Sequence, residues 1–87
     1  MNSEILKKFN EIQQIVINSK DEEYDDYIKL DFYKYYKQAT IGDCNTGKPW
    51  FYEQLKSMKW TAWDNIRGMT KEDAMNNYIS LYNDVKK

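Results

Sequence analysis

"LKSMKWTAWDNIRG" (residues 55–68) is the stretch of sequence that decides the fold. Its apolar residues fall at positions i, i+3, i+7, i+8 and i+11 of a helix: Leu55, Met58, Ala62, Trp63 and Ile66. A helix with one apolar face must bury that face against another element. Gly68 suits a left-handed cap at the end, and Pro49 suits the start. We therefore predict a helix that begins near Pro49 and ends at Gly68.

Helical spacing also dominates the chain before this stretch. Ile5, Phe9, Ile12 and Val16 are four, three and four residues apart, which predicts an amphipathic helix with Ser3 as its cap. Residues 18–26, "NSKDEEYDD", break the pattern and are interpreted as an acidic linker. Its acids favour the start of a second helix from about Asp26 to Ala39. A loop from Gly42 to Pro49 follows.

A fourth helix is predicted to open at residues 70–73. "TKED" has the form of a capping box, with Asp in the place that Glu or Gln usually takes. The apolar stripe that follows consists of Ala74, Tyr78, Leu81 and Val85. No strand alternation and no internal repeat occurs, and 87 residues suffice for one modest core. The prediction is an all-α fold, a small four-helix bundle that forms a single domain over residues 1–87.

Charge is unevenly distributed along the chain. The net charge is −1, but residues 33–67 carry six Lys or Arg against three Asp or Glu, whereas residues 1–32 carry four against eight. A local basic patch in an acidic chain suits a small anionic ligand better than a long polyanion. We therefore expect no nucleic-acid partner.

Several function classes are disfavoured by composition. Histidine is absent, which removes the commonest general base and the commonest metal ligand, so we expect no catalytic residue and no metal site. Cys44 is the single cysteine and cannot form an internal disulfide, which favours a reducing compartment. The N-terminus lacks the apolar run of a signal peptide, and no stretch has the ~20 apolar residues of a membrane span. We expect a cytoplasmic protein without stable membrane insertion.

Three residues interrupt the apolar stripes. Lys59 lies between Leu55 and Trp63, where burial of an unpaired ammonium group is costly. Two interpretations stay open: the side chain extends its ammonium group into water, or it binds an anion. Lys37 poses the same question on the second helix. Tyr78 places a phenol on the core stripe of the fourth helix, where its hydroxyl needs a hydrogen-bond partner.

Tyr33 and Tyr36 precede Lys37 in a run of three tyrosines and two lysines. Together with Lys59 and Tyr78 they would offer aromatic rings and ammonium groups around one cleft. Such a cleft suits a flat base joined to phosphates, since stacking of a base contributes ~1–3 kcal/mol. The residues alone indicate a module for a nucleotide-like anion. For Trp60 and Trp63, packing between helices is the favoured interpretation.

Three motifs then point to a family. "YKYYKQATIGD" (33–43), "KWTAW" (59–63) and "TKEDAMNNYI" (70–79) follow the family pattern Y-x-x-Y-K-Q-A-T-x-G-D, K-W-x-A-W and S/T-x-E-D-A-x-x-x-Y-I in the same order and with the same gaps. The sequence resembles the acyl-CoA-binding protein family, closely over residues 25–85 and loosely over the first helix. Members are four-helix bundles that hold medium- to long-chain acyl-CoA esters in the cytosol and do no chemistry.

The resemblance also implies roles for particular residues. Tyr33 would stack near the adenine, Tyr36 and Lys37 would face the phosphates, and Lys59 would neutralise the ribose 3′-phosphate beside Tyr78. Lys34 and Tyr35 complete the binding run. Leu30 and Met58 would border the groove for the acyl chain; Met58 is larger than the residue that many members have there.

The resemblance implies an acyl-CoA carrier and pool buffer that needs no cofactor, acts as a monomer and meets acyl-CoA-using enzymes as transient partners. Two rivals remain: a helical protein-interaction module with no small-molecule ligand, and a thioesterase-like enzyme, against which the missing histidine argues.

Overall fold

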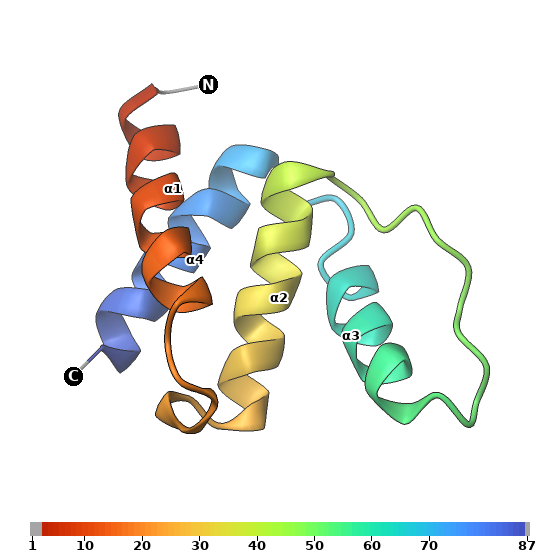
Figure 1. The fold of residues 1–87 in the computed structure, drawn as a ribbon. Coiled ribbons are helices and arrows are strands. Elements are labelled where there is room, and N and C mark those ends of the chain that lie inside the picture. The colour runs from red at the N-terminus through yellow and green to blue at the C-terminus, as the bar shows by residue number, and fades with distance from the viewer. Residues whose placement is uncertain (1–2, 87) are drawn as a thin grey trace.

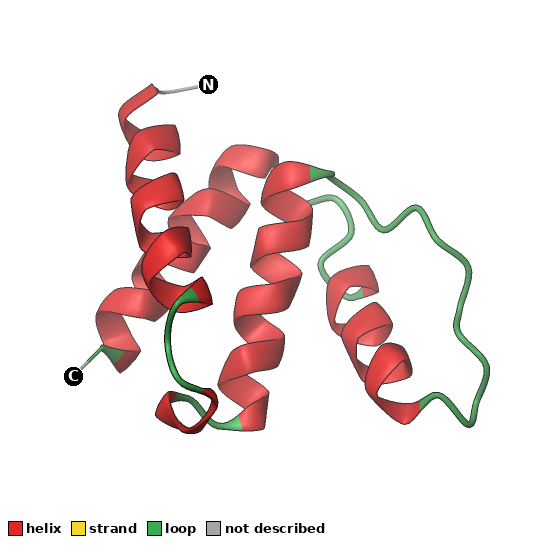
Figure 2. Cartoon of the chain, in the orientation of Figure 1, coloured by secondary structure: helices red, strands yellow, loops and turns green. Residues whose placement is uncertain are grey.

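Four α-helices make up most of residues 3–86, which are the residues that this computed structural model describes (Figure 1). The helices are α1 (Ser3–Ile17), α2 (Asp26–Thr40), α3 (Gln54–Asp64) and α4 (Lys71–Val85), with a short 3₁₀ turn, η1 (Asp21–Glu23), before α2. Figure 2 shows only helices and loops over the described residues. The predicted all-α four-helix architecture is confirmed.

The central helix is α2. It packs against both α4 and α3, while α1 packs against α4. In Figure 1, α1 and α3 lie on opposite sides of α2. Among the described helices α3 contacts α2 alone. One side of α3 is therefore left without a covering helix.

Local signals explain where α2 and α4 begin. The side chain of Asp25 accepts a hydrogen bond of 2.9 Å from the backbone N–H of Ile28, which caps α2. Thr70 caps α4 in the same way, accepting 3.0 Å from the N–H of Asp73. Both starts are as predicted from the sequence. Ser3, the predicted cap of the first helix, is instead the first residue of α1.

The core is aromatic and joins three helices. The ring of Tyr78 on α4 lies 5.1 Å from that of Phe9 on α1 and 5.0 Å from that of Phe32 on α2. All three side chains are at most 4% exposed. The remaining buried members of this cluster are Ile12, Ala39, Ala74 and Met75. Tyr78 therefore holds α1, α2 and α4 together.

The acidic linker over residues 18–26 is more ordered than predicted. It contains η1, and Tyr24 directly after η1 packs its ring 5.3 Å from that of Phe32. An aromatic residue within an acidic run thus ties the segment to the core.

The third helix starts later than predicted, at Gln54 rather than near Pro49. The N–H of Glu53 donates 2.9 Å to the carbonyl of Trp50, and the N–H of Trp50 donates 3.2 Å to the Glu53 carboxylate. These two bonds close a separate turn over residues 50–53, so the helix begins only after it. The helix also ends early, at Asp64, although Gly68 does adopt the left-handed conformation, with φ of 95°.

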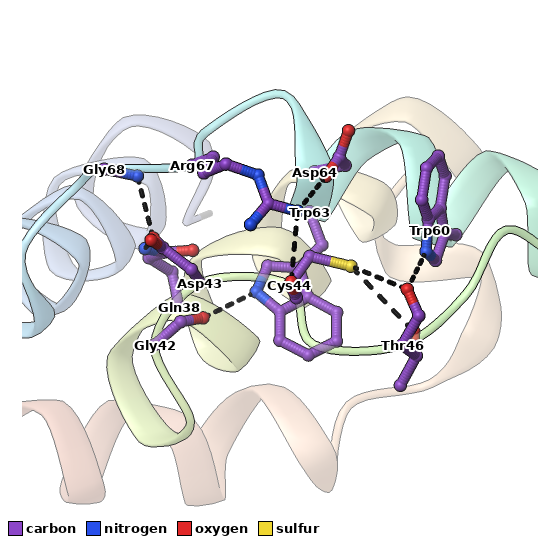
Figure 3. Close-up of polar contacts among 10 residues, drawn as sticks. All are labelled: Gln38, Gly42, Asp43, Cys44, Thr46, Trp60, Trp63, Asp64, Arg67 and Gly68. Carbon is purple, nitrogen blue, oxygen red and sulfur yellow. Dashed lines mark hydrogen bonds and ion pairs between the residues drawn. The ribbon is translucent and has the colours of Figure 1, made fainter.

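Side chains of α3, and one from the segment that follows it, hold the loop between α2 and α3 (Figure 3). The indole N–H of Trp63 donates to the carbonyl of Gly42 at 2.8 Å, and that of Trp60 donates to the carbonyl of Thr46 at 2.9 Å. Arg67 donates to the carbonyl of Cys44 at 3.1 Å. Trp63 is buried, as predicted for a packing residue, and both indoles fix the path of the loop. Packing of Trp60 between helices stays a prediction.

Candidate functional site

A cavity of about 720 Å³ lies along α2 and reaches from the second half of α1 to the first half of α3. Its volume lies within the ~300–1,000 Å³ of small-molecule sites. All four helices contribute to its lining. The lining residues are Gln13 and Ile17 of α1; Asp26, Lys29, Leu30, Phe32, Tyr33 and Tyr36 of α2; Leu55, Met58 and Lys59 of α3; and Tyr78 of α4.

Part of the apolar face of α3, which the sequence suggested was buried in the core, lines the cavity instead. Leu55 and Met58 are 62% and 46% exposed, whereas Trp63 on the same stripe is only 2% exposed. The first half of the stripe thus faces the cavity and the second half faces α2. Leu30 and Met58, predicted to border an apolar groove, both line the cavity.

Two lysines meet at Tyr33. The ammonium group of Lys59 lies 5.3 Å from the centre of the Tyr33 ring, and that of Lys37 lies 5.9 Å from the same centre. Lys37 also lies 4.9 Å from the ring of Trp63. Neither lysine forms an ion pair with a carboxylate within residues 3–86. Two ammonium groups without an acidic partner therefore converge on one aromatic ring beside the cavity.

Three phenols from two helices complete this region. Tyr33 and Tyr36 come from α2 and Tyr78 from α4, and all three line the cavity. Burial raises the pKa of Tyr33, and the nearby thiol of Cys44 adds to the effect. Burial is also the main cause that raises the pKa of Tyr78, with smaller contributions from Tyr24 and Tyr36. Both hydroxyls stay protonated near neutral pH and are available as hydrogen-bond donors.

Tyr78 is the most buried of the three, with 2% of its surface exposed. Its hydroxyl has no hydrogen-bond partner among residues 3–86. A phenol at a cavity wall without a partner is suited to an acceptor on a ligand.

Lys34 and Tyr35 do not line the cavity. The ammonium group of Lys34 is 2.9 Å from the carboxylate of Asp31 and 5.0 Å from the centre of the Tyr35 ring. Tyr35 packs at the edge of the core. A ligand role for these two residues stays a prediction.

Sequence reasoning missed the part of the lining that comes from α1. Gln13 and Ile17 are one turn apart, on a face beside the Ile5–Phe9–Ile12 stripe. Ile17 is 61% exposed. The available signal was Ile17 itself, because an apolar side chain outside the core stripe is not explained by burial in the core. Leu55 was recognised as part of the apolar stripe of the third helix, but not as a residue of the cavity.

Two further features of the described chain bear on function. Within residues 3–86, no group of three or more His, Cys, Asp or Glu side chains is placed to hold a metal ion. None of the helices of that region has the length and apolar character to cross a membrane.

A family model described as "Acyl CoA binding protein" matches residues 6–82. The chain belongs to the acyl-CoA-binding protein family. It is 50% identical over 66 residues to the acyl-CoA-binding domain-containing protein 6 homolog of Dictyostelium discoideum, a match that covers 76% of this chain and 21% of that protein. The chain thus spans about a fifth of the length of this relative.

Solved structures of the acyl-CoA-binding protein family share the fold. Acyl-CoA-binding protein 2 of Oryza sativa superimposes with a TM-score of 0.85 at 32% identity, over 93% of this chain and 89% of that one. The acyl-CoA-binding protein of Babesia bovis superimposes with a TM-score of 0.81 at 39% identity, over 91% and 90% of the two chains. The chain therefore has the four-helix fold of acyl-CoA-binding proteins.

Proposed function

We propose that this protein binds medium- to long-chain acyl-CoA esters in the cavity and acts as a carrier and buffer of the cytoplasmic acyl-CoA pool. The observation that carries the proposal is the convergence of Lys37 and Lys59 on Tyr33 beside the cavity. Membership of the acyl-CoA-binding protein family supports the choice of ligand.

The nucleotide head of the ligand binds at the polar side of the cavity in this proposal. The adenine stacks near Tyr33, where an aromatic face is worth ~1–3 kcal/mol. Tyr36 and Lys37 face the phosphates. Lys59 neutralises the ribose 3′-phosphate, and the hydroxyl of Tyr78 donates a hydrogen bond nearby. Lys34 and Tyr35, outside the cavity lining, contribute at most at its edge.

The acyl chain lies along the apolar part of the lining, against Ile17, Leu30, Leu55 and Met58. Each methylene removed from water contributes at most ~0.8 kcal/mol. Affinity therefore rises with chain length until the groove is filled.

Calorimetric titration with butanoyl-CoA and hexadecanoyl-CoA tests the proposal. We expect saturable binding of one ligand per chain, with the longer ester bound at least roughly a hundredfold more tightly because its additional methylenes leave water. Free coenzyme A serves as the control for the head group. Equal affinities for the two esters would end the groove model, and absence of binding would favour the protein-interaction module.

The protein holds the thioester without cleaving it in this proposal, and it does so as a monomer that passes the ester to acyl-CoA-using enzymes. A thiol-reactive dye distinguishes this from a thioesterase, because hydrolysis would release free coenzyme A steadily from bound ester. We expect no release above that of the ester alone.

A further inference from the structure

The turn that precedes α3 exposes three consecutive aromatic side chains. Trp50, Phe51 and Tyr52 are 68%, 88% and 67% exposed, and we call these three residues the aromatic tip. The ring of Tyr52 lies 6.3 Å from that of Trp50 and 5.6 Å from that of Phe51. They contact one another rather than the core. The fold leaves their apolar area in water, unlike that of Trp63.

The aromatic tip is fixed before any partner arrives. The two hydrogen bonds between Trp50 and Glu53 close the turn, and the bond from the indole of Trp60 to the carbonyl of Thr46 holds the preceding loop. A partner therefore meets preformed aromatic surface and has little chain to order, which favours binding.

The segment that carries the aromatic tip has a net positive charge. Residues 45–59 contain three lysines and one glutamate, in a chain whose net charge is −1. Lys48 and Lys56 are exposed on either side of the tip, and Lys56 is 3.3 Å from Glu53. The acidic residues of η1 lie beyond α2 from this loop (Figure 1). Of the three lysines, Lys56 pairs with Glu53 and Lys59 lies over the Tyr33 ring, which leaves Lys48 to carry the net positive charge beside the aromatic tip.

Apolar surface continues from the aromatic tip to the cavity. Leu55, three residues after Tyr52, is 62% exposed and lines the cavity, and Met58 one turn later does the same. The aromatic tip and the apolar cavity wall thus belong to one surface.

We propose that the aromatic tip, with Leu55 and the flanking lysines, docks reversibly on the surface of an anionic lipid bilayer. Tryptophan and tyrosine favour the membrane–water interface because each combines an apolar ring with a polar group. Lysines beside them are attracted to anionic headgroups. Docking is shallow and reversible, since three rings are buried and no helix is inserted. It places the cavity entrance beside the bilayer, and it does not depend on what the cavity binds.

Sedimentation with phospholipid vesicles, in the absence of any acyl-CoA, tests the proposal. We expect the protein to bind vesicles that contain phosphatidylserine and to bind pure phosphatidylcholine vesicles more weakly. The Trp50→Ser/Phe51→Ser variant should lose at least about tenfold in affinity because most of the buried ring area is gone. Lys48→Gln should lose up to roughly fivefold, and only on anionic vesicles.

Leu6→Ser/Ile15→Ser is the matched control. It also removes two exposed apolar side chains, 40% and 50% exposed, but from α1 on the far side of α2. We expect this variant to bind as the wild type does. Equal losses in the control and the tip variant, or no binding of the wild type to anionic vesicles, would overturn the proposal. Circular dichroism of each variant checks that the helices are retained.

Quenching by brominated lipids locates the contact. Bromine near the headgroups should quench the fluorescence of Trp50, and Trp50→Phe should remove most of this quenching because Trp63 is buried and Trp60 is half-buried. Quenching of the same strength in Trp50→Phe would contradict docking through the tip. A second copy of the chain is the other occupant to test: dimerisation without lipid that the tip substitutions abolish would assign the surface to self-association and overturn the proposal.

Discussion

Tyr33 gathers the two cations on which the proposed head-group site depends. An ammonium group over an aromatic ring is stabilised by the ring, but two such groups near one ring repel each other. In the absence of a carboxylate partner, a bound phosphate relieves this repulsion. The two lysines are therefore expected to matter more for ligand affinity than for folding.

Lys59→Ala is the first prediction at this scale. Loss of a charged hydrogen bond of ~1.5–3 kcal/mol should weaken binding of hexadecanoyl-CoA by roughly tenfold to a hundredfold. The melting temperature should stay unchanged or rise slightly. Titration calorimetry and thermal melts measure the two effects, with Lys8→Ala, an exposed lysine of α1, as control. A loss of stability without a loss of affinity would show that Lys59 only covers the edge of the core.

Tyr78→Phe separates the ring of this residue from its hydroxyl. The ring contacts with Phe9 and Phe32 are retained, and the hydroxyl has no partner among residues 3–86. We therefore expect unchanged or slightly higher stability to urea, together with weaker binding of hexadecanoyl-CoA by roughly tenfold, because a donor to a charged group is lost. Unchanged affinity in this variant would remove Tyr78 from the site.

At the scale of elements, the position of α3 depends on the segments that precede and follow it. It contacts α2 alone among the described helices, and the segments on either side of it meet at Asp43. The carboxylate accepts 2.7 Å from the N–H of Gly68 and 2.8 Å from the side chain of Gln38, which is completely buried (Figure 3). These bonds, with a smaller contribution from Arg67, lower the pKa of Asp43 below its ordinary 3.8.

This lowered pKa predicts a pH dependence. Because the folded state binds the proton of Asp43 less readily than the unfolded state, the carboxylate stabilises the fold fully above its ordinary pKa of 3.8. The contribution is lost as the pH falls through the lower, folded value. Asp43→Asn should thus be less stable than the wild type at neutral pH, and the difference should shrink in acid.

Urea unfolding at neutral pH and at low pH measures the effect, with Glu11→Gln, an exposed carboxylate on α1, as the control. A stability difference between wild type and Asp43→Asn that is the same at both pH values would show that the charge of Asp43 contributes nothing.

The elements also show where sequence reasoning succeeded. The starts of α2 and α4 were predicted correctly, because Asp26 follows an acidic cap and Thr70 is a strong cap in its own right. The start of α3 was predicted too early, because Pro49 favours a turn as well as a helix start. The bonds between Trp50 and Glu53 decide in favour of the turn.

At the scale of the whole molecule, a bundle in which α1 and α3 do not contact each other leaves room for a ligand between them. The sequence showed that one face of the third helix is apolar, but not what covers it. The stripe alone therefore made Leu55 and Met58 look like core residues, and only the family resemblance placed Met58 at a groove; the structure places both on the cavity. Lys59 and Tyr78 were found from sequence because each breaks an apolar stripe. Gln13 was not, because a glutamine on a helix surface is unremarkable.

The central claim is that one cavity, built by all four helices, binds acyl-CoA. A titration of isotope-labelled protein with hexadecanoyl-CoA, followed by two-dimensional NMR, tests it most directly. We expect the largest shift changes at Ile17, Tyr33, Leu55, Lys59 and Tyr78, saturating at one ligand per chain. Changes confined to residues outside the cavity lining, such as Ile15 and Tyr82, or no changes at all, would contradict the account.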